Sequence, residues 1–112
     1  MQNVNEFVDA LNEAFDRRLA EKPWRPVFSV VKGKKFDKVI YKEKNRENMP
    51  GASVYCFVDA EGNIYKAEGW KKPAKGVRAK LADISAEFVD QIAASGYANT
   101  GWLYRRSWWQ YR

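Results

Sequence analysis

The chain has 112 residues, with one cysteine and no histidine, and its formal net charge is +6. That length suits one domain with one modest core, and a lone cysteine cannot form an internal disulfide. Histidine is the commonest general base and transition-metal ligand, so its absence, together with the single cysteine, leads us to expect no zinc site. We also expect no cofactor. No apolar run approaches the roughly 18 to 20 residues that span a bilayer, and the N-terminus lacks the pattern of a signal peptide. We therefore expect a cytoplasmic protein that has no contact with a membrane.

Positive charge is concentrated in three blocks of the sequence. Residues 25–48 and 69–80 each carry a net charge of +5, and residues 97–112 carry +3, whereas both predicted helices are acidic. Clustered cations of this kind favour an anionic partner.

The first predicted element is a helix over Asn3–Ala20. Its apolar side chains recur at helical spacing and form one stripe, made of Val4, Phe7, Val8, Leu11, Phe15 and Leu19. Asn3 followed by Glu6 three residues later is a variant of the capping box, and Pro23 ends the helix.

Two strands are predicted next, over Val27–Val31 and Phe36–Lys44, joined by a lysine-rich turn at 32–35. Both faces of the second strand mix apolar and charged residues. That mixture is typical of a strand near a sheet edge or with one solvent-facing side.

The stretch from Gly51 to Lys75 organises the chain around a β-hairpin. Alternation places Val54, Cys56 and Val58 on one face of its first strand, and Ser53, Tyr55, Phe57 and Asp59 on the other. Asp59 to Gly62 is a common short hairpin turn, and the partner strand over 63–66 places Ile64 and Tyr65 on opposite faces.

The remainder contains a basic segment, a second helix and an aromatic tail. Residues 70–76 are expected to be irregular, and 77–81 form either a short strand or a helical turn. Ser85 is a good N-cap for a helix over 85–95, and 100–105 is a candidate last strand. Together these elements predict a single α+β domain over 1–112, with a mostly antiparallel sheet of four or five strands and two helices packed on one face.

Cations and aromatic rings lie beside one another in several segments. Single-stranded nucleic acid is held by cations that follow its phosphates and by flat side chains that stack on its bases. The phosphate-contacting candidates are Lys34, Lys35, Lys38, Lys71, Lys72, Lys75 and Arg78, and the stacking candidates are Tyr41, Tyr65 and Trp70. The alternative is a purely structural role, in which the aromatic side chains fill the core while the lysines keep the protein soluble.

Catalytic alternatives are weaker. A nuclease would need a carboxylate cluster that binds a metal ion, and the acidic residues that we considered show no diagnostic spacing: Asp37, Glu43, Asp59, Glu61 and Asp83. Cys56 as a nucleophile lacks a histidine partner. We therefore expect a non-enzymatic protein without a metal site.

The tail suggests a different partner. Trp, Tyr and Arg dominate the energetic hot spots of protein interfaces, and the tail is rich in all three. Its candidate contacts are Trp102, Arg105, Arg106, Trp108 and Trp109. The alternative function is therefore a module that binds or inhibits another protein, and a homodimer remains open. If the tail binds no partner, Trp108 and Trp109 would instead cover an open edge of the core.

The hairpin and the basic segment resemble small bacteriophage proteins that have no assigned activity. The resemblance covers about a quarter of the chain and rests on Ser53-Val54, Cys56 to Asp59, Gly62, Tyr65-Lys66, Trp70-Lys71, Pro73 to Lys75 and Arg78. It implies a viral origin, a location in the host cytoplasm and, under the alternative reading, a host protein as partner. The favoured function remains weakly sequence-selective binding of single-stranded DNA or RNA.

Overall fold

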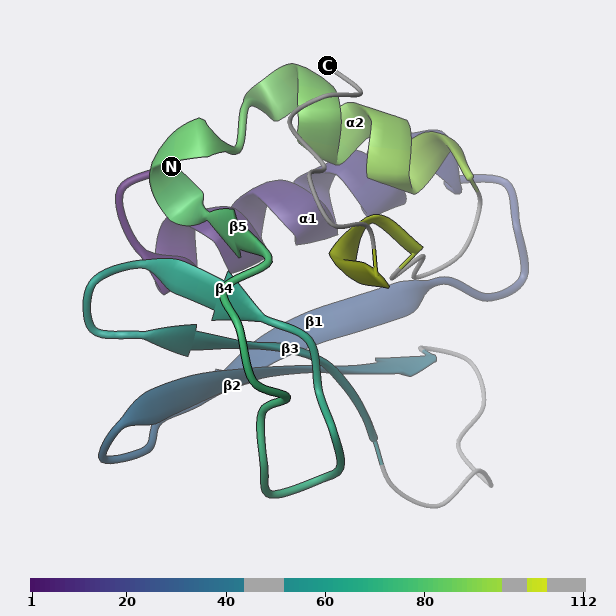
Figure 1. The fold of residues 1–112 in the computed structure, drawn as a ribbon. Coiled ribbons are helices and arrows are strands. Elements are labelled where there is room, and N and C mark those ends of the chain that lie inside the picture. The colour runs from purple at the N-terminus through teal and green to yellow at the C-terminus, as the bar shows by residue number, and fades with distance from the viewer. Residues whose placement is uncertain (44–51, 96–100, 105–112) are drawn as a thin grey trace.

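The computed structural model of this chain describes residues 1–43, 52–95 and 101–104. Two helices lie on one side of a five-stranded sheet, whose strands follow chain order and run antiparallel to their neighbours (Figure 1). The elements are α1 (Val4–Arg18), β1 (Pro26–Val31), β2 (Phe36–Glu43), β3 (Ser53–Asp59), β4 (Asn63–Tyr65), β5 (Ala79–Lys80), η1 (Leu81–Asp83), α2 (Ala86–Ala94) and η2 (Gly101–Tyr104). The predicted α+β class is confirmed.

Both helices begin where the sequence predicts a cap. The Asn3 side chain accepts a hydrogen bond from the Glu6 backbone N–H at 2.8 Å, and the Ser85 hydroxyl accepts one from Phe88 N–H at 3.0 Å. The predicted apolar stripe of α1 is buried along its whole length. Asp90 of α2 pairs with two arginines at the end of α1, which ties the two helices together.

The outer edge of the sheet is strand β1, and its backbone is partly capped by a helix side chain. Asn12 of α1 accepts a hydrogen bond from Phe28 N–H at 2.7 Å and donates its amide to Phe28 O at 2.9 Å. The side chain thus takes the place of a neighbouring strand at this residue and protects an otherwise open edge.

The central hairpin is confirmed, with one correction. The pairing of β2 with β3 shifts between Val39, which is opposite Cys56, and Ile40, which is opposite Val54, so that Tyr55 lies at the shift. Such a bulge re-aims a side chain, and Tyr55 joins Cys56 in the core under the helices, where its ring lies 5.2 Å from Phe28. Strict alternation wrongly placed Tyr55 on the face opposite Cys56.

The structure corrects two expectations about the tail. Gly101–Tyr104 is a 3₁₀ helix, so the strand predicted over 100–105 is wrong for these residues. Trp102 and Leu103 are consecutive and both buried, which a strand with one solvent-facing side does not allow. Trp102 donates its indole N–H to the Tyr55 hydroxyl at 3.0 Å. It is therefore a core residue rather than a surface for a protein partner.

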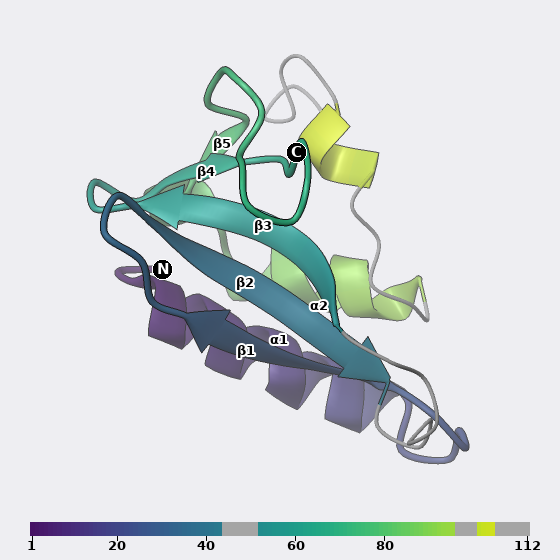
Figure 2. The same cartoon turned by 90° about the horizontal axis from the view of Figure 1, so that it is seen from below.

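The side of the sheet away from the helices carries its own aromatic cluster. Phe36 contacts Phe57 and Tyr65 edge-on, with ring centroids 6.2 and 5.3 Å apart. A long loop between β4 and β5, which we call loop 66–78, projects from this side, as the view from below the sheet shows (Figure 2). The residues predicted to be irregular, 70–76, form the end of this loop, and the segment that follows holds both a short strand, β5, and a helical turn, η1.

Candidate nucleic-acid interface

Loop 66–78 has a defined shape that presents two residues at its tip. The Ala74 N–H donates to Lys66 O at 2.9 Å and the Glu68 N–H donates to Lys72 O at 2.9 Å, so the two arms of the loop run against each other. A bridge between Ala67 and Pro73 completes this small hairpin. Trp70 and Lys71 therefore lie at the turn, where side chains reach outward.

Trp70 connects the loop tip to the sheet. The Lys38 ammonium of β2 lies 4.2 Å from the centroid of the Trp70 ring, a cation–π contact. The indole remains 48% exposed, far more than a core tryptophan. The structure thus brings together two of the predicted binding residues, Lys38 and Trp70, from segments more than thirty residues apart.

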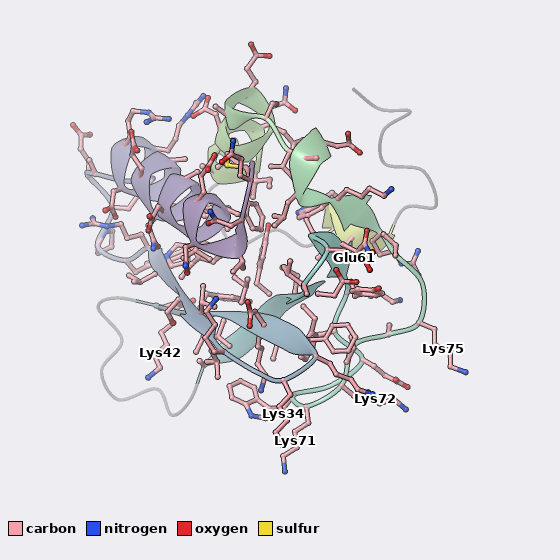
Figure 3. All side chains as sticks on the ribbon, turned by 90° about the vertical axis from the view of Figure 1, so that its left-hand side faces the viewer. Lys34, Lys42, Glu61, Lys71, Lys72 and Lys75 are labelled. Atoms are coloured by element: carbon pink, nitrogen blue, oxygen red, sulfur yellow. The ribbon has the colours of Figure 1, made fainter. Side chains whose placement is uncertain are left out.

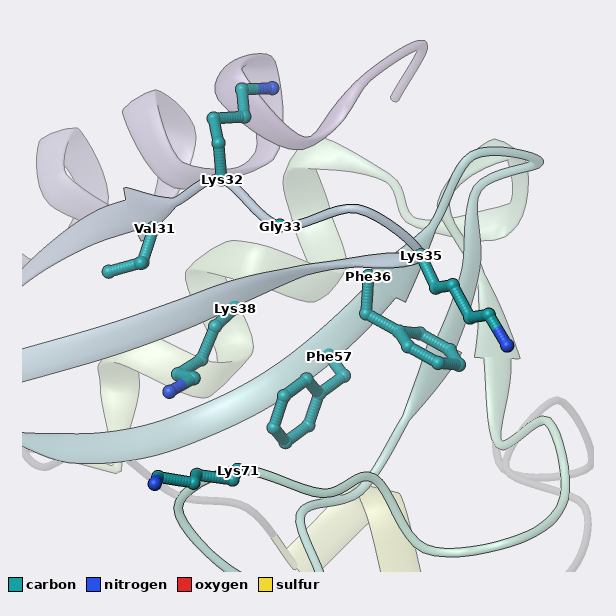
Figure 4. A pocket seen from close by; sticks show the side chains of 8 residues that line it. All are labelled: Val31, Lys32, Gly33, Lys35, Phe36, Lys38, Phe57 and Lys71. Carbon is teal, nitrogen blue, oxygen red and sulfur yellow. The ribbon is translucent and has the colours of Figure 1, made fainter.

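A groove of about 260 Å³ lies between the β1–β2 turn and loop 66–78 (Figure 4). Its lining combines three apolar side chains with four lysines: Val31, Phe36 and Phe57, and Lys32, Lys35, Lys38 and Lys71. The Phe57 ring lies between the side chains of Lys38 and Lys71, whose amino groups point the same way.

The turn at the rim of this groove depends on Gly33. A Cβ atom at that position would lie 2.3 Å from the Phe36 carbonyl oxygen, which the backbone cannot accommodate. Gly33 thus lets Lys32 and Lys35 follow each other through a close turn.

Cations dominate the surface around the groove. Residues 32–38 and 66–80 contain ten lysines and arginines and two carboxylates. Each carboxylate offsets the charge of one lysine: Asp37 pairs with Lys32 at 3.2 Å, and Glu68 lies 3.7 Å from Lys72. Most of the ten cations therefore keep their full charge. Within the described ranges, Lys34, Lys35, Lys71 and Lys75 have no carboxylate within ion-pair distance. In Figure 3, Lys34, Lys71 and Lys72 extend from the side of the molecule away from the helices. A surface with this many unneutralised cations has a positive potential that attracts phosphate.

The remaining predicted contacts, Tyr41, Arg78 and Tyr65, each have part of the side chain engaged or buried within the protein. The Tyr41 ring packs in the core against Phe28 and Tyr55, at 5.8 and 6.2 Å, because residue 41 has the opposite strand parity to Lys38. The prediction that Tyr41 lies beside Lys38 on the basic surface is therefore corrected. The Nε of Arg78 is buried and has no hydrogen-bond partner among the described residues, so this atom is not presented to a ligand.

Tyr65 is held by the hairpin turn through its hydroxyl group. Its hydroxyl donates to Asp59 Oδ2 at 2.9 Å, and Asp59 also accepts from the backbone N–H groups of Glu61 and Asn63. Partial burial acts to raise the pKa of Asp59, but these hydrogen bonds outweigh it and hold that pKa below its ordinary value. A charged Asp59 anchors the turn that precedes β4.

The residues weighed for catalysis do not converge. Burial raises the pKa of the Cys56 thiol, which disfavours the reactive thiolate. Asp37 and Asp59 are engaged in the contacts described above. Within the described part of the chain, no three or more Asp, Glu or Cys side chains are grouped so as to hold a metal ion. The same residues contain no helix long and apolar enough to cross a bilayer.

The predicted protein-binding contacts Arg105, Arg106, Trp108 and Trp109 lie outside the described residues. The candidate site is therefore the basic surface formed by residues 32–38 and loop 66–78. We call this surface the loop face.

The fold and the loop face define a small α+β protein with a basic, aromatic surface opposite its helices. The chain belongs to a family of unknown function, DUF7717, whose model matches residues 1–105. No curated protein and no solved structure matches it.

Sequence reasoning missed the apolar floor of the groove. Val31 and Phe36 flank the lysine-rich turn, and Phe57 was assigned only to a strand face opposite Cys56. The signal was present in the strand parity, because Phe36 and Lys38 share one face of β2 and Phe57 pairs with Lys38 in the ladder. What the sequence lacked was the course of loop 66–78, which closes the groove from the other side.

Proposed function

We propose that this protein binds single-stranded nucleic acid through the loop face, without catalysing a reaction on it. The observation that carries the proposal is the meeting of the two lysine-rich segments, 32–38 and 66–78, around an exposed tryptophan. Each segment alone would be an ordinary solvated surface. Together they provide the two elements that single-strand binding requires, a cationic track and a stacking ring.

The form of the loop face favours a single strand over a duplex. A duplex is usually read by an element that enters a groove, but α1 and α2 are acidic on their outer surfaces and lie on the far side of the sheet. Trp70 stands at the tip of an irregular loop, where an unpaired base has access to its ring. Stacking on one base contributes roughly 1 to 3 kcal/mol.

The residue types favour weak sequence selectivity. The cations of the loop face are mainly lysines, which act as point charges toward phosphate, whereas bidentate readout of base edges relies on Arg, Asn and Gln. We therefore expect affinity to depend on strand length and salt more than on sequence.

Tryptophan fluorescence tests this proposal. Titration with a single-stranded oligonucleotide at low salt should quench Trp70, and log affinity should fall linearly with log salt concentration, with a slope of about −0.7 per phosphate contacted. Polyphosphate and a duplex of equal charge serve as controls. Absence of oligonucleotide binding at low salt would refute the proposal, and polyphosphate binding as tight as that of the oligonucleotide would reduce it to general attraction of anions.

A further inference from the structure

The groove has a feature that attraction of phosphate does not explain. Its floor is apolar, formed by Val31, Phe36 and Phe57, although lysines surround it. Val31 is 43% exposed, so an aliphatic side chain faces water inside a cationic rim. Phosphate groups remain hydrated and gain nothing from contact with such a floor, whereas a flat, weakly polar group gains by covering it.

The placement of the lysines matches one nucleotide with its flanking phosphates. Lys38 and Lys71 stand on either side of Phe57 with their amino groups pointing one way, while Lys35 lies toward the other end of the groove (Figure 4). A strand that crosses the groove can thus place a phosphate near each end and one base over the floor between them.

We propose that the groove is a base-binding subsite that holds one unstacked base of the bound strand against its apolar floor. This inference rests on the proposed function and adds a second base position to that at Trp70. The side chains that line the groove provide ammonium donors and no side-chain acceptor. Thymine, which presents two carbonyl acceptors, is therefore a suitable probe base.

The test compares two strands on the same protein. One is a thymidine oligonucleotide, and the other is an abasic strand of equal length that keeps every phosphate. Fluorescence anisotropy gives both affinities for the wild type and for Val31→Ser, which removes apolar floor without changing charge. Val27→Ser is the matched control, because Val27 is similarly exposed, at 40%, on the same face of β1 but does not line the groove.

The expected result is a change in the ratio of the two affinities. In Val31→Ser the preference for the thymidine strand over the abasic strand should fall by about fivefold, with abasic binding unchanged. Val27→Ser should alter neither. Phe57→Leu, which keeps an apolar side chain at a buried position, provides a second floor variant and should lower the same ratio.

Three results would overturn the inference in distinguishable ways. If the ratio of thymidine-strand to abasic-strand affinity is unchanged in both Val31→Ser and folded Phe57→Leu, no base binds in the groove. The proposed function would be unaffected by that result. An equal loss in Val27→Ser would show that the effect is not local to the groove. Absence of binding by both strands would overturn the proposed function and this inference together.

Discussion

The two sides of the sheet differ in what their side chains do. On the helix side, apolar residues are buried and several charges form ion pairs, as with Asp16 and Arg25 at 2.7 Å. On the loop side, cations outnumber carboxylates and Trp70 is half exposed. Since neighbouring residues of one strand supply both sides, we expect substitutions that lower stability and substitutions that weaken the proposed binding to fall on opposite sides of the sheet.

The largest expected effect is a loss of stability from the helix side. Phe15 is fully buried and its ring lies 5.3 Å from Phe28. Phe15→Ala leaves a cavity, so the free energy of unfolding should fall by about 3 to 5 kcal/mol. Urea denaturation measures this change. The folded fraction of this variant should bind the oligonucleotide with wild-type affinity. A weaker affinity would show that the helix side also contributes to binding.

The second effect is a loss of affinity from the loop side. Trp70→Ala removes a stacking ring worth roughly 1 to 3 kcal/mol of binding free energy, so affinity should fall by about 5- to 150-fold. Stability should change little, because Trp70 is about half exposed and its cation–π contact with Lys38 is worth about 0.5 to 1 kcal/mol at an exposed site.

Trp24→Ala is the matched control for this variant. Trp24 precedes β1 at the end of the strand remote from Val31, outside the loop face. We expect it to leave affinity unchanged. A folded Trp70→Ala protein that binds as tightly as the wild type would exclude the ring from the interface.

A smaller effect is expected from a single cation. Lys71→Gln removes one phosphate contact, so the slope of log affinity against log salt should become shallower by about 0.7. Lys22→Gln removes the same charge from an exposed position after α1. If both variants change the slope equally, net charge rather than the loop face governs binding.

The smallest effect is on acid stability, and both sides of the sheet contribute. Hydrogen bonds from Arg18 and Arg17 lower the pKa of Asp90 to about 2, and the turn around Asp59 also lowers the pKa of that carboxyl. A carboxyl with a lowered pKa in the folded state stabilises the fold fully above its unfolded pKa, and this contribution is lost as pH falls through the folded pKa. The melting temperature should therefore fall as the pH is lowered from about 4 toward 2.

Asp90→Asn and Asp59→Asn should each flatten this acid decline, because each removes one titrating group. Neither should alter oligonucleotide affinity at neutral pH. An acid decline that is identical in the wild type and both variants would assign the pH dependence to other carboxylates.

Local patterns predicted most of the fold. The apolar stripe of α1, the caps at Asn3 and Ser85 and the turn at Asp59 depend on neighbours within a few residues, and all are confirmed. The bulge at Tyr55 was not predicted, because it depends on how β3 pairs with β2 and on the packing of the Tyr55 ring against Phe28. Trp102 was misplaced for a similar reason, since its contact with Tyr55 spans 47 residues of sequence.

The candidate site was predicted in part. Lysines and Trp70 were identified by charge and residue type, and the contact between Lys38 and Trp70 joins two of them. Tyr41 was misassigned because it was grouped with the lysines by proximity in sequence, although strand alternation already places it on the face opposite Lys38. The groove floor could not be predicted, because a loop that returns across a sheet leaves no periodic signal in its sequence.

If a single strand binds the loop face, as we propose, it should leave the helix side of the protein unaffected. Backbone amide chemical shifts, followed by NMR during titration with a thymidine oligonucleotide at low salt, test this directly. We expect the amide signals of residues 32–38 and 66–78 to shift and those of α1 and α2 to stay in place. Shifts confined to the helices, or none on the loop face at saturating oligonucleotide, would contradict it.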